Sequence, residues 1–254
     1  MRKNVSRRRF VGTVGAGIAG LTCATPVLGA RGDDPKEGAE EKGIATAVRK
    51  LFENGKREQA IGLLDKHDVK YDTDVVTVPR TFGEPESDDV TTDEYLQKSN
   101  TSVGLDGYHL SGDLYDAGLW WATDITDYTF DDWGPKDGAA ISFGESRWEY
   151  EPGTKHLNDH VSGFDPNPEG CIVEWDDGAE TDYGNYTGNV GASFWVTLEK
   201  RDTDEHNVYG HYAHTYDYLQ MPGGVSFGIS AGVFSVGVSG GARSWQVPSN
   251  TIEM

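Results

Sequence analysis

Cysteine is almost absent from this sequence. The 254 residues include two cysteines, Cys23 and Cys171, and Cys23 lies in an N-terminal segment that we expect to be cleaved off. The remaining chain then has one thiol and cannot form an intramolecular disulfide, which excludes a disulfide-stabilised scaffold. Cys171 lies in the strand-like run 170–175, where we expect a small buried side chain rather than a catalytic thiol.

Basic residues are also scarce. The chain has 22 Lys and Arg against 42 Asp and Glu, and its formal net charge is −20. Such a surface repels phosphate groups, so we expect neither nucleic acid nor anionic lipid as a partner. The 7 Trp, 12 Tyr and 9 Phe are enough aromatic side chains for a core, which argues against intrinsic disorder. Adaptation to molar salt, where the Debye length falls to about 3 Å, explains the acidity better.

A long, strongly apolar run is lacking too. The stretch 11–28 is apolar or small, but it is rich in glycine and interrupted by Pro26. A membrane-spanning helix needs about 20 consecutive apolar residues, so we expect no transmembrane segment in the mature chain. Helical periodicity of useful length is missing from residue 108 onward, which disfavours a doubly wound α/β fold.

The first 30 residues have the layout of an export signal: basic residues, then an apolar stretch, then small residues that provide cleavage points. Within them, SRRRFV at 6–11 resembles the twin-arginine export motif, with Arg7 and Arg8 as its arginine pair. Together with the acidity, this resemblance implies a haloarchaeal-type protein that is secreted or displayed at the cell surface. It is confined to the leader, and the mature region resembles no family that we can name.

The leader also changes the charge of what remains. It contains five basic residues and no acid, so its removal shifts the net charge from −20 to −25. Thr22 and Gly20 depart from the pattern that precedes a lipid-attachment cysteine, so we favour a cleaved soluble product over a lipoprotein anchored at Cys23.

The mature chain divides into four parts. Residues 31–42 are charged and predict a flexible linker. Residues 43–71 carry two short apolar helical faces separated by Asn54-Gly55, which predicts a small helical hairpin. Residues 72–105 are mostly polar and predict a connector with one short strand at 74–78, and residues 106–254 predict an antiparallel β domain.

Short β-branched and aromatic runs dominate that last part, with turn residues between them every 8–15 positions. This pattern of short strands and turns is typical of an antiparallel β-sandwich or a barrel-like domain. The expected strands are 108–115, 118–125, 139–144, 147–150, 171–175, 192–200, 208–218, 225–230, 234–239 and 243–247.

One uncharged stretch defines a turn. Apolar side chains occupy odd positions from Val225 to Ile229 and even positions from Phe234 to Val238. A strand cannot change its buried face without an extra residue or a turn, so Ala231-Gly232 marks a bulge or a tight hairpin. A membrane-inserting hairpin is the alternative, because no charge occurs in this stretch before Arg243.

Histidines and acidic loops are the candidate metal ligands. The histidines His156 and His160 have the spacing of a helical metal pair, but Leu157 replaces the general-base glutamate of the zincin motif. His206, His211, His214 and Asp217 could converge with them only through the fold. An oxygen-rich loop favours Ca²⁺ as a possible cofactor, with the candidate ligands Asp176, Asp177, Glu180 and Asp182.

Catalytic signatures are weak. Ser230 matches a G-x-S-x-G pattern, but no helix follows it, as the nucleophile elbow requires. A glycosidase needs only two facing carboxyl groups, and four glutamates qualify by strand position without any pair being singled out: Glu145, Glu149, Glu174 and Glu199.

Aromatic side chains suggest a binding surface instead. A stacking platform for sugar rings is predicted from Trp120, Trp121, Tyr128 and Trp133, although most of these rings are equally suited to a core. Asn100 and Asn185 match the N-glycosylation pattern and are expected in loops.

These observations favour a secreted, salt-adapted β domain that is not an enzyme, a binding or surface-interaction module for carbohydrate or another cell-surface component. Two alternatives stay open: an extracellular hydrolase that uses paired carboxylates or a metal, and a membrane-active or antagonistic secreted protein. The sequence does not define the oligomeric state.

Overall fold

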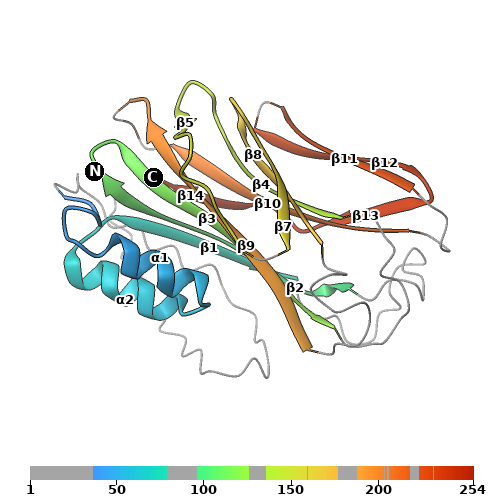
Figure 1. Ribbon diagram of the computed structural model, residues 1–254, viewed down its shortest axis with the longest axis horizontal. Coiled ribbons are helices and arrows are strands. Elements are labelled where there is room, and N and C mark those ends of the chain that lie inside the picture. Colours follow the sequence, from blue (N-terminus) through green and yellow to red (C-terminus); the bar gives the residue numbers. More distant parts are fainter. Residues whose placement is uncertain are drawn as a thin grey trace, which may run out of the picture.

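The computed structural model describes residues 37–78, 96–125, 136–158, 160–176, 188–202, 204, 206–217, 223–230 and 232–254. In these residues two antiparallel β-sheets pack face to face (Figure 1). A helical hairpin covers the outer face of one sheet, and a β-hairpin lies over the outer face of the other. The predicted antiparallel β-sandwich preceded by a small helical hairpin is therefore confirmed, whereas the leader lies outside the described residues.

Each sheet has six strands, all paired antiparallel. Sheet A has the order β1 (Tyr71–Thr77), β2 (Leu96–Ser111), β3 (Leu114–Ile125), β9 (Gly188–Lys200) and β5 (Trp148–Tyr150), and β6 (His156–Leu157) also pairs with β9. Sheet B has the order β13 (Ala242–Gln246), β10 (Asn207–Asp217), β4 (Asp137–Phe143), β8 (Gly170–Trp175) and β7 (Val161–Asn167), and β14 (Asn250–Glu253) also pairs with β10.

The main core lies between the two sheets, because alternate residues of each strand point inward. Three aromatic side chains join the sheets at its centre. Trp121 of β3 stacks on Tyr212 of β10 with ring centroids 5.6 Å apart, and it meets Trp175 of β8 edge-on at 5.8 Å. Cys171 is fully buried in the same core, as expected of a small buried side chain, and this burial raises the pKa of its thiol to about 12.

The helical hairpin consists of α1 (Ala45–Glu53) and α2 (Arg57–His67), joined at the predicted turn. Asn54 is the C-cap of α1, and Gly55 follows with φ +66°, a conformation that glycine adopts without strain. Phe52 packs on sheet A, with its ring centroid 5.0 Å from that of Trp195. The apolar faces that the sequence indicated are therefore buried against the outer face of sheet A (Figure 1).

Two ion pairs, each between a partly exposed arginine and a buried aspartate, fasten this hairpin to the sheet. From α1, Arg49 pairs with Asp116 of β3, and from α2, Arg57 Nε donates to Asp106 Oδ1 of β2 at 2.8 Å. Both carboxylates are fully buried. Burial raises the pKa of Asp106, and the Arg57 guanidinium opposes that increase. Each helix thus supplies one cation to a carboxylate that would otherwise be buried without a counter-charge.

The linker and the connector are more structured than the sequence indicated. Within the expected linker, Ala39 is fully buried and its N–H donates to the carbonyl oxygen of His109 at 3.0 Å. The expected connector contains β1 and the first part of β2, which pair with each other over Tyr71–Thr77. The polar residues in the first part of β2 predicted a loop. In the fold, polar side chains such as Thr101 are buried and form hydrogen bonds with β3, so this segment is a strand.

Other strand predictions also needed correction. The expected strand 108–115 is two strands, because Ser111 pairs with Leu114 across a tight turn in which Gly112 has φ +55°. The sequence did not predict β7, because Gly163 and Pro166 are residue types that are disfavoured within strands. This strand is the last in the order of sheet B, a position at which proline is tolerated because no ladder hydrogen bond is lost.

Aspartates of β1 join the two sheets along one side of the sandwich. The Asp72 carboxylate accepts a hydrogen bond from the backbone N–H of Glu253 at 2.8 Å, and Asp74 accepts one from Thr251 at 2.9 Å. The amide of Asn250 reaches back to the carbonyl oxygens of Asp74 and Val103. Side chains of sheet A therefore provide the acceptors that β14, the end strand of sheet B, would otherwise lack.

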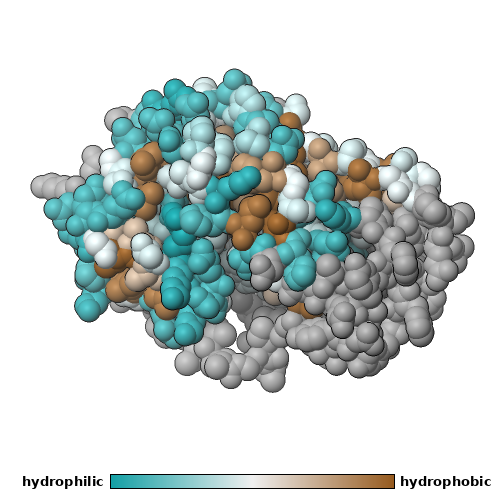
Figure 2. All heavy atoms as spheres, in the orientation of Figure 1, coloured by the Kyte–Doolittle hydropathy of each residue, from teal (hydrophilic) through white to brown (hydrophobic). Residues whose placement is uncertain are grey.

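The β-hairpin comprises β11 (Gly223–Ser230) and β12 (Val233–Gly240). Ser230 pairs with Val233, so the predicted tight turn at 231–232 is confirmed, and Gly232 has φ +74°. The hairpin lies over sheet B, on the side of the sandwich opposite to the helices (Figure 1). In Figure 2 this region, at the upper right, is pale to brown, whereas much of the rest of the visible surface is hydrophilic.

The importance of the ion pairs with buried aspartates can be measured with Arg57→Met. We expect this change to lower the free energy of unfolding by about 3 kcal/mol, because Asp106 then stays buried without its cation. The measurement is denaturant unfolding of the full chain in molar salt. The matched control is Arg147→Met, which removes an exposed pair with Asp202 and should cost less than about 1 kcal/mol. Equal losses in the two variants would contradict this account.

A histidine under the β-hairpin predicts a pH effect. Burial lowers the pKa of His211 from 6.5 to about 4, so between these values the unfolded chain binds a proton that the folded chain does not. Stability therefore rises with pH through this window. Between pH 5 and pH 7 we expect wild type to gain about 2 kcal/mol more than His211→Gln, measured by denaturant unfolding. Identical pH dependence in both proteins would show that this histidine is not responsible.

Candidate functional site

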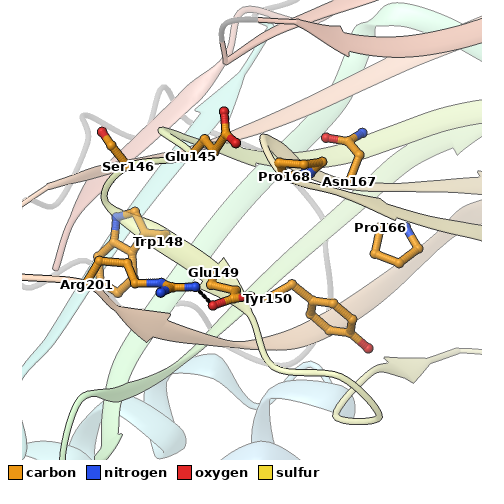
Figure 3. A pocket seen from close by; sticks show the side chains of 9 residues that line it. All are labelled: Glu145, Ser146, Trp148, Glu149, Tyr150, Pro166, Asn167, Pro168 and Arg201. Carbon is orange, nitrogen blue, oxygen red and sulfur yellow. Dashed lines mark ion pairs between the residues drawn. The ribbon is translucent and has the colours of Figure 1, made fainter.

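An open cleft of about 720 Å³ lies where β5 meets the turn between β7 and β8 (Figure 3). Its walls carry two carboxylates, one guanidinium, one amide, the hydroxyl groups of a serine and a tyrosine, and several rings. The lining residues are Glu145, Ser146, Trp148, Glu149, Tyr150, Pro166, Asn167, Pro168 and Arg201.

A tight turn and a strand pairing position one wall of the cleft. The backbone N–H groups of Arg147 and Trp148 both donate to the carbonyl oxygen of Gly144, at 2.8 and 3.1 Å, which folds the chain back before β5. In β5, Trp148 points into the core and is 1% exposed, whereas the next residue, Glu149, points outward. The alternation of a β-strand thus anchors this wall through an indole and presents a carboxylate to the cleft.

The opposite wall is the turn at 166–169. Asn167 Oδ1 accepts a hydrogen bond from the backbone N–H of Glu169 at 2.9 Å, the pattern that stabilises turns of this kind. Pro166 and Pro168 flank it and limit its backbone freedom. Asn167 lines the cleft, so this wall supplies a polar side chain from a turn of limited backbone freedom.

The charges of the cleft are partly neutralised. Glu149 forms an ion pair with Arg201, and both side chains are about half exposed, at 52% and 48%. Figure 3 shows the Glu149 carboxylate turned towards Arg201, while the Glu145 carboxylate points away from this pair. Glu145 and Glu149, two of the four predicted carboxylate candidates, therefore line the same cleft but do not face each other.

Aromatic rings border the cleft. The half-buried ring of Tyr150 lies 5.4 Å from that of Phe164 on β7, and Lys155 Nζ lies 4.6 Å above the Phe164 ring. The hydroxyl of Tyr150 accepts a hydrogen bond from the N–H of Gly153 at 3.2 Å, which fixes the ring position. The buried indole N–H of Trp148 has no hydrogen-bond partner among the described residues.

The predicted stacking platform does not form as expected. Successive strand residues point to opposite faces, so Trp121 is in the core and 2% exposed. Trp120 lies on the outer face of sheet A, where its indole covers Gly104 and its N–H donates to Asp106 Oδ2 at 3.0 Å. Tyr128 and Trp133 lie outside the described residues.

The histidines take separate partners. His156 Nε2 lies 2.6 Å from Arg49 Nη1, in a short strand rather than a helix. His206 bonds to Asp202, His211 to Ser142 and His214 to Asp137. In the described part of the chain, no three His, Cys, Asp or Glu side chains are grouped so that they could hold a metal ion.

The remaining predicted residues are scattered or lie outside the description. Glu174 pairs with Lys136 at 3.5 Å on sheet B, Glu199 lies on β9, and Ser230 is exposed at the end of β11 with a second strand, not a helix, after it. Asn100 lies within β2 rather than in a loop. Of the predicted calcium ligands the structure describes only Asp176, so the calcium site stays a prediction. Glycosylation of Asn185 also stays a prediction. The residues that lie outside the described ranges are Asp177, Glu180, Asp182 and Asn185.

Sequence reasoning named the two glutamates of the cleft but missed its other residues. Asn167, Arg201 and Tyr150 are distant in sequence from one another, and no local motif joins them. The Pro-Asn-Pro run at 166–168 was the one available signal, because such runs mark rigid surface turns.

No protein-family model and no curated protein matches this chain. Parts of solved structures do align with it. The pilus backbone RrgB from Streptococcus pneumoniae aligns over 56% of this chain and 43% of its own, with 6% identity and a TM-score of 0.31. The major pilin subunit BcpA of Bacillus cereus aligns over 56% and 53%, with 9% identity and a TM-score of 0.27.

A collagen-binding domain from a Staphylococcus aureus adhesin aligns over 51% of this chain and 86% of its own, with 11% identity and a TM-score of 0.23. The alignments to the two pilus proteins span about half of each of those chains. At these values no function is transferred from them to this chain. Neither helix in the described residues has the length and apolar character needed to cross a membrane.

Proposed function

We propose that this chain is an exported, non-enzymatic binding module and that the cleft at β5 binds a neutral saccharide. The observation that carries the proposal is the combination of groups in that cleft. The Glu145 carboxylate, the Ser146 hydroxyl and the Asn167 amide line one open space beside the half-buried ring of Tyr150.

These groups match the chemistry of a sugar ring. Carboxylates and amides form hydrogen bonds with vicinal hydroxyl groups, and an aromatic ring packs against the apolar face of the sugar. A neutral ligand fits better than an anionic one, because two carboxylates line the cleft and its one guanidinium, that of Arg201, is already paired with Glu149. The open shape of the cleft suits a segment of a longer surface polymer, which is accessible to an exported protein.

Binding is favoured over hydrolysis by the state of the two carboxylates. A glycosidase uses two carboxyl groups on opposite sides of the scissile bond, one of them as a general acid. Here Glu149 is engaged by Arg201, so among the described residues that line the cleft no second carboxylate is directed at the same point as Glu145. The export and salt adaptation inferred from the leader and the composition belong to this proposal.

The test is a glycan array followed by calorimetry on the full chain in molar NaCl. We expect retention of neutral glycans and at least tenfold weaker binding by Glu145→Ala, because a hydrogen bond to a charged acceptor contributes about 1.5–3 kcal/mol. Glu53→Ala is the matched control, since it also removes an exposed carboxylate, from α1 and outside the cleft.

Two results would overturn the proposal. One is the absence of any neutral glycan among the ligands, and the other is equal binding by Glu145→Ala and Glu53→Ala. Cleavage of a bound glycan that Glu145→Gln abolishes would support the hydrolase alternative instead.

A further inference from the structure

The β11–β12 hairpin is the most unusual surface of this acidic chain, because it has no charge. A quarter of all residues are charged, yet none lies between Asp217 and Arg243. The hairpin also takes no part in the cleft. The surface of a chain with net charge −20 is expected to carry charges throughout, so a surface segment without any charge indicates that it contacts something apolar.

The register of the hairpin separates its side chains into two kinds. On one face the cross-strand pairs are Val225 with Val238, Phe227 with Val236 and Ile229 with Phe234. On the other face the pairs are built mostly from serine and glycine, as in Ser226 with Gly237. The hairpin is therefore amphipathic, with an apolar face and a small, weakly polar face.

Sheet B covers the apolar face incompletely. Phe234, near the turn, is 6% exposed, whereas Val238, at the open end of the hairpin, is 43% exposed. The intermediate residues Phe227, Ile229 and Val236 are half-buried. The apolar face is thus wider than the surface that covers it.

The surface beneath the hairpin is made of small residues. Gly138 lies under the Phe227 ring so closely that a Cβ built on it would be 2.3 Å from a ring carbon. Together with Ala140, Ala213 and Ile172 this contact forms a cluster separate from the main core. At the turn, Ser142 Oγ donates to the Gly232 carbonyl oxygen at 2.8 Å. Such an attachment holds the hairpin without burying it among the strands of the sandwich.

We propose that the β11–β12 hairpin is a membrane-docking element that leaves sheet B and lays its apolar face on a lipid bilayer with neutral headgroups. Independently of any ligand in the cleft, this accounts for the missing charge, the apolar face and its partial cover. The hairpin has no basic residue that could pair with the extra negative charge of an anionic headgroup, so zwitterionic lipid is the partner that fits.

The hairpin lies in the interface rather than crossing the bilayer. In the described residues β11 and β12 pair only with each other, so each has an outer edge whose backbone groups need water or another partner. Hydrocarbon would leave these groups unsatisfied, whereas the headgroup region keeps them hydrated. The Ser and Gly face then remains directed to water.

The test is cosedimentation of the full chain with phosphatidylcholine vesicles in molar NaCl, about 2 M, the salt range inferred from its acidic composition. We expect wild type to bind and Val238→Asp to reduce the bound fraction at least tenfold, because the charge enters the apolar face at a position already 43% exposed in the folded chain. Ser226→Asp adds the same charge to the opposite face and should change binding less than twofold.

A second variant leaves the hairpin sequence intact. Gly138→Val places side-chain atoms where Phe227 packs, so it should displace the hairpin and increase vesicle binding several-fold. Denaturant unfolding checks that each variant is folded. The proposal is overturned if neither wild type nor Gly138→Val binds, if only anionic vesicles bind, or if Ser226→Asp and Val238→Asp lose binding equally. The last result, with a change in sedimentation coefficient, would indicate association with a second copy through the outer face.

Discussion

Four buried aspartates hold this fold together. Asp72, Asp106, Asp116 and Asp137 are each at most 2% exposed, whereas the other acidic side chains that the structure describes are half-buried or exposed. A buried carboxylate is costly unless hydrogen bonds or a cation compensate it. Each of these four carboxylates accepts a hydrogen bond from, or forms an ion pair with, a residue distant in sequence. Each therefore links elements that lie far apart along the chain. Asp116, for example, accepts hydrogen bonds from Tyr108 and Thr197 and pairs with Arg49.

These links divide the molecule into a firmly held part and a loosely held part. The helices are fixed to sheet A by two ion pairs with buried aspartates, and β14 is fixed to β1 by Asp72 and Asp74. The cleft stands on β5 and β9 of this firm part, which gives its polar groups the rigidity that recognition requires. The β11–β12 hairpin has no such ion pair and rests on a separate small cluster, which suits a segment that changes its contacts.

The sequence predicted those features that depend on local periodicity. The helical hairpin followed from apolar spacing and Asn54-Gly55, and the turn at 231–232 followed from the switch of apolar residues between odd and even positions. It could not predict the polar first part of β2 or the proline-containing β7, which are strands because their neighbours supply the hydrogen bonds. It could not assemble the cleft, because Glu145, Asn167 and Arg201 meet only through the pairing of β5 with β9 and of β7 with β8.

The contrast between firm and loose attachment is the central claim, and hydrogen exchange of the native protein, read by mass spectrometry in molar salt, tests it most directly. We predict that the backbone amides of α1 and α2 exchange together with those of β2 and β3, at the slow rate of the sandwich, and that β11 and β12 exchange much faster. Exchange of β11 and β12 at the rate of the sandwich, or exchange of the helices ahead of that hairpin, would contradict the account.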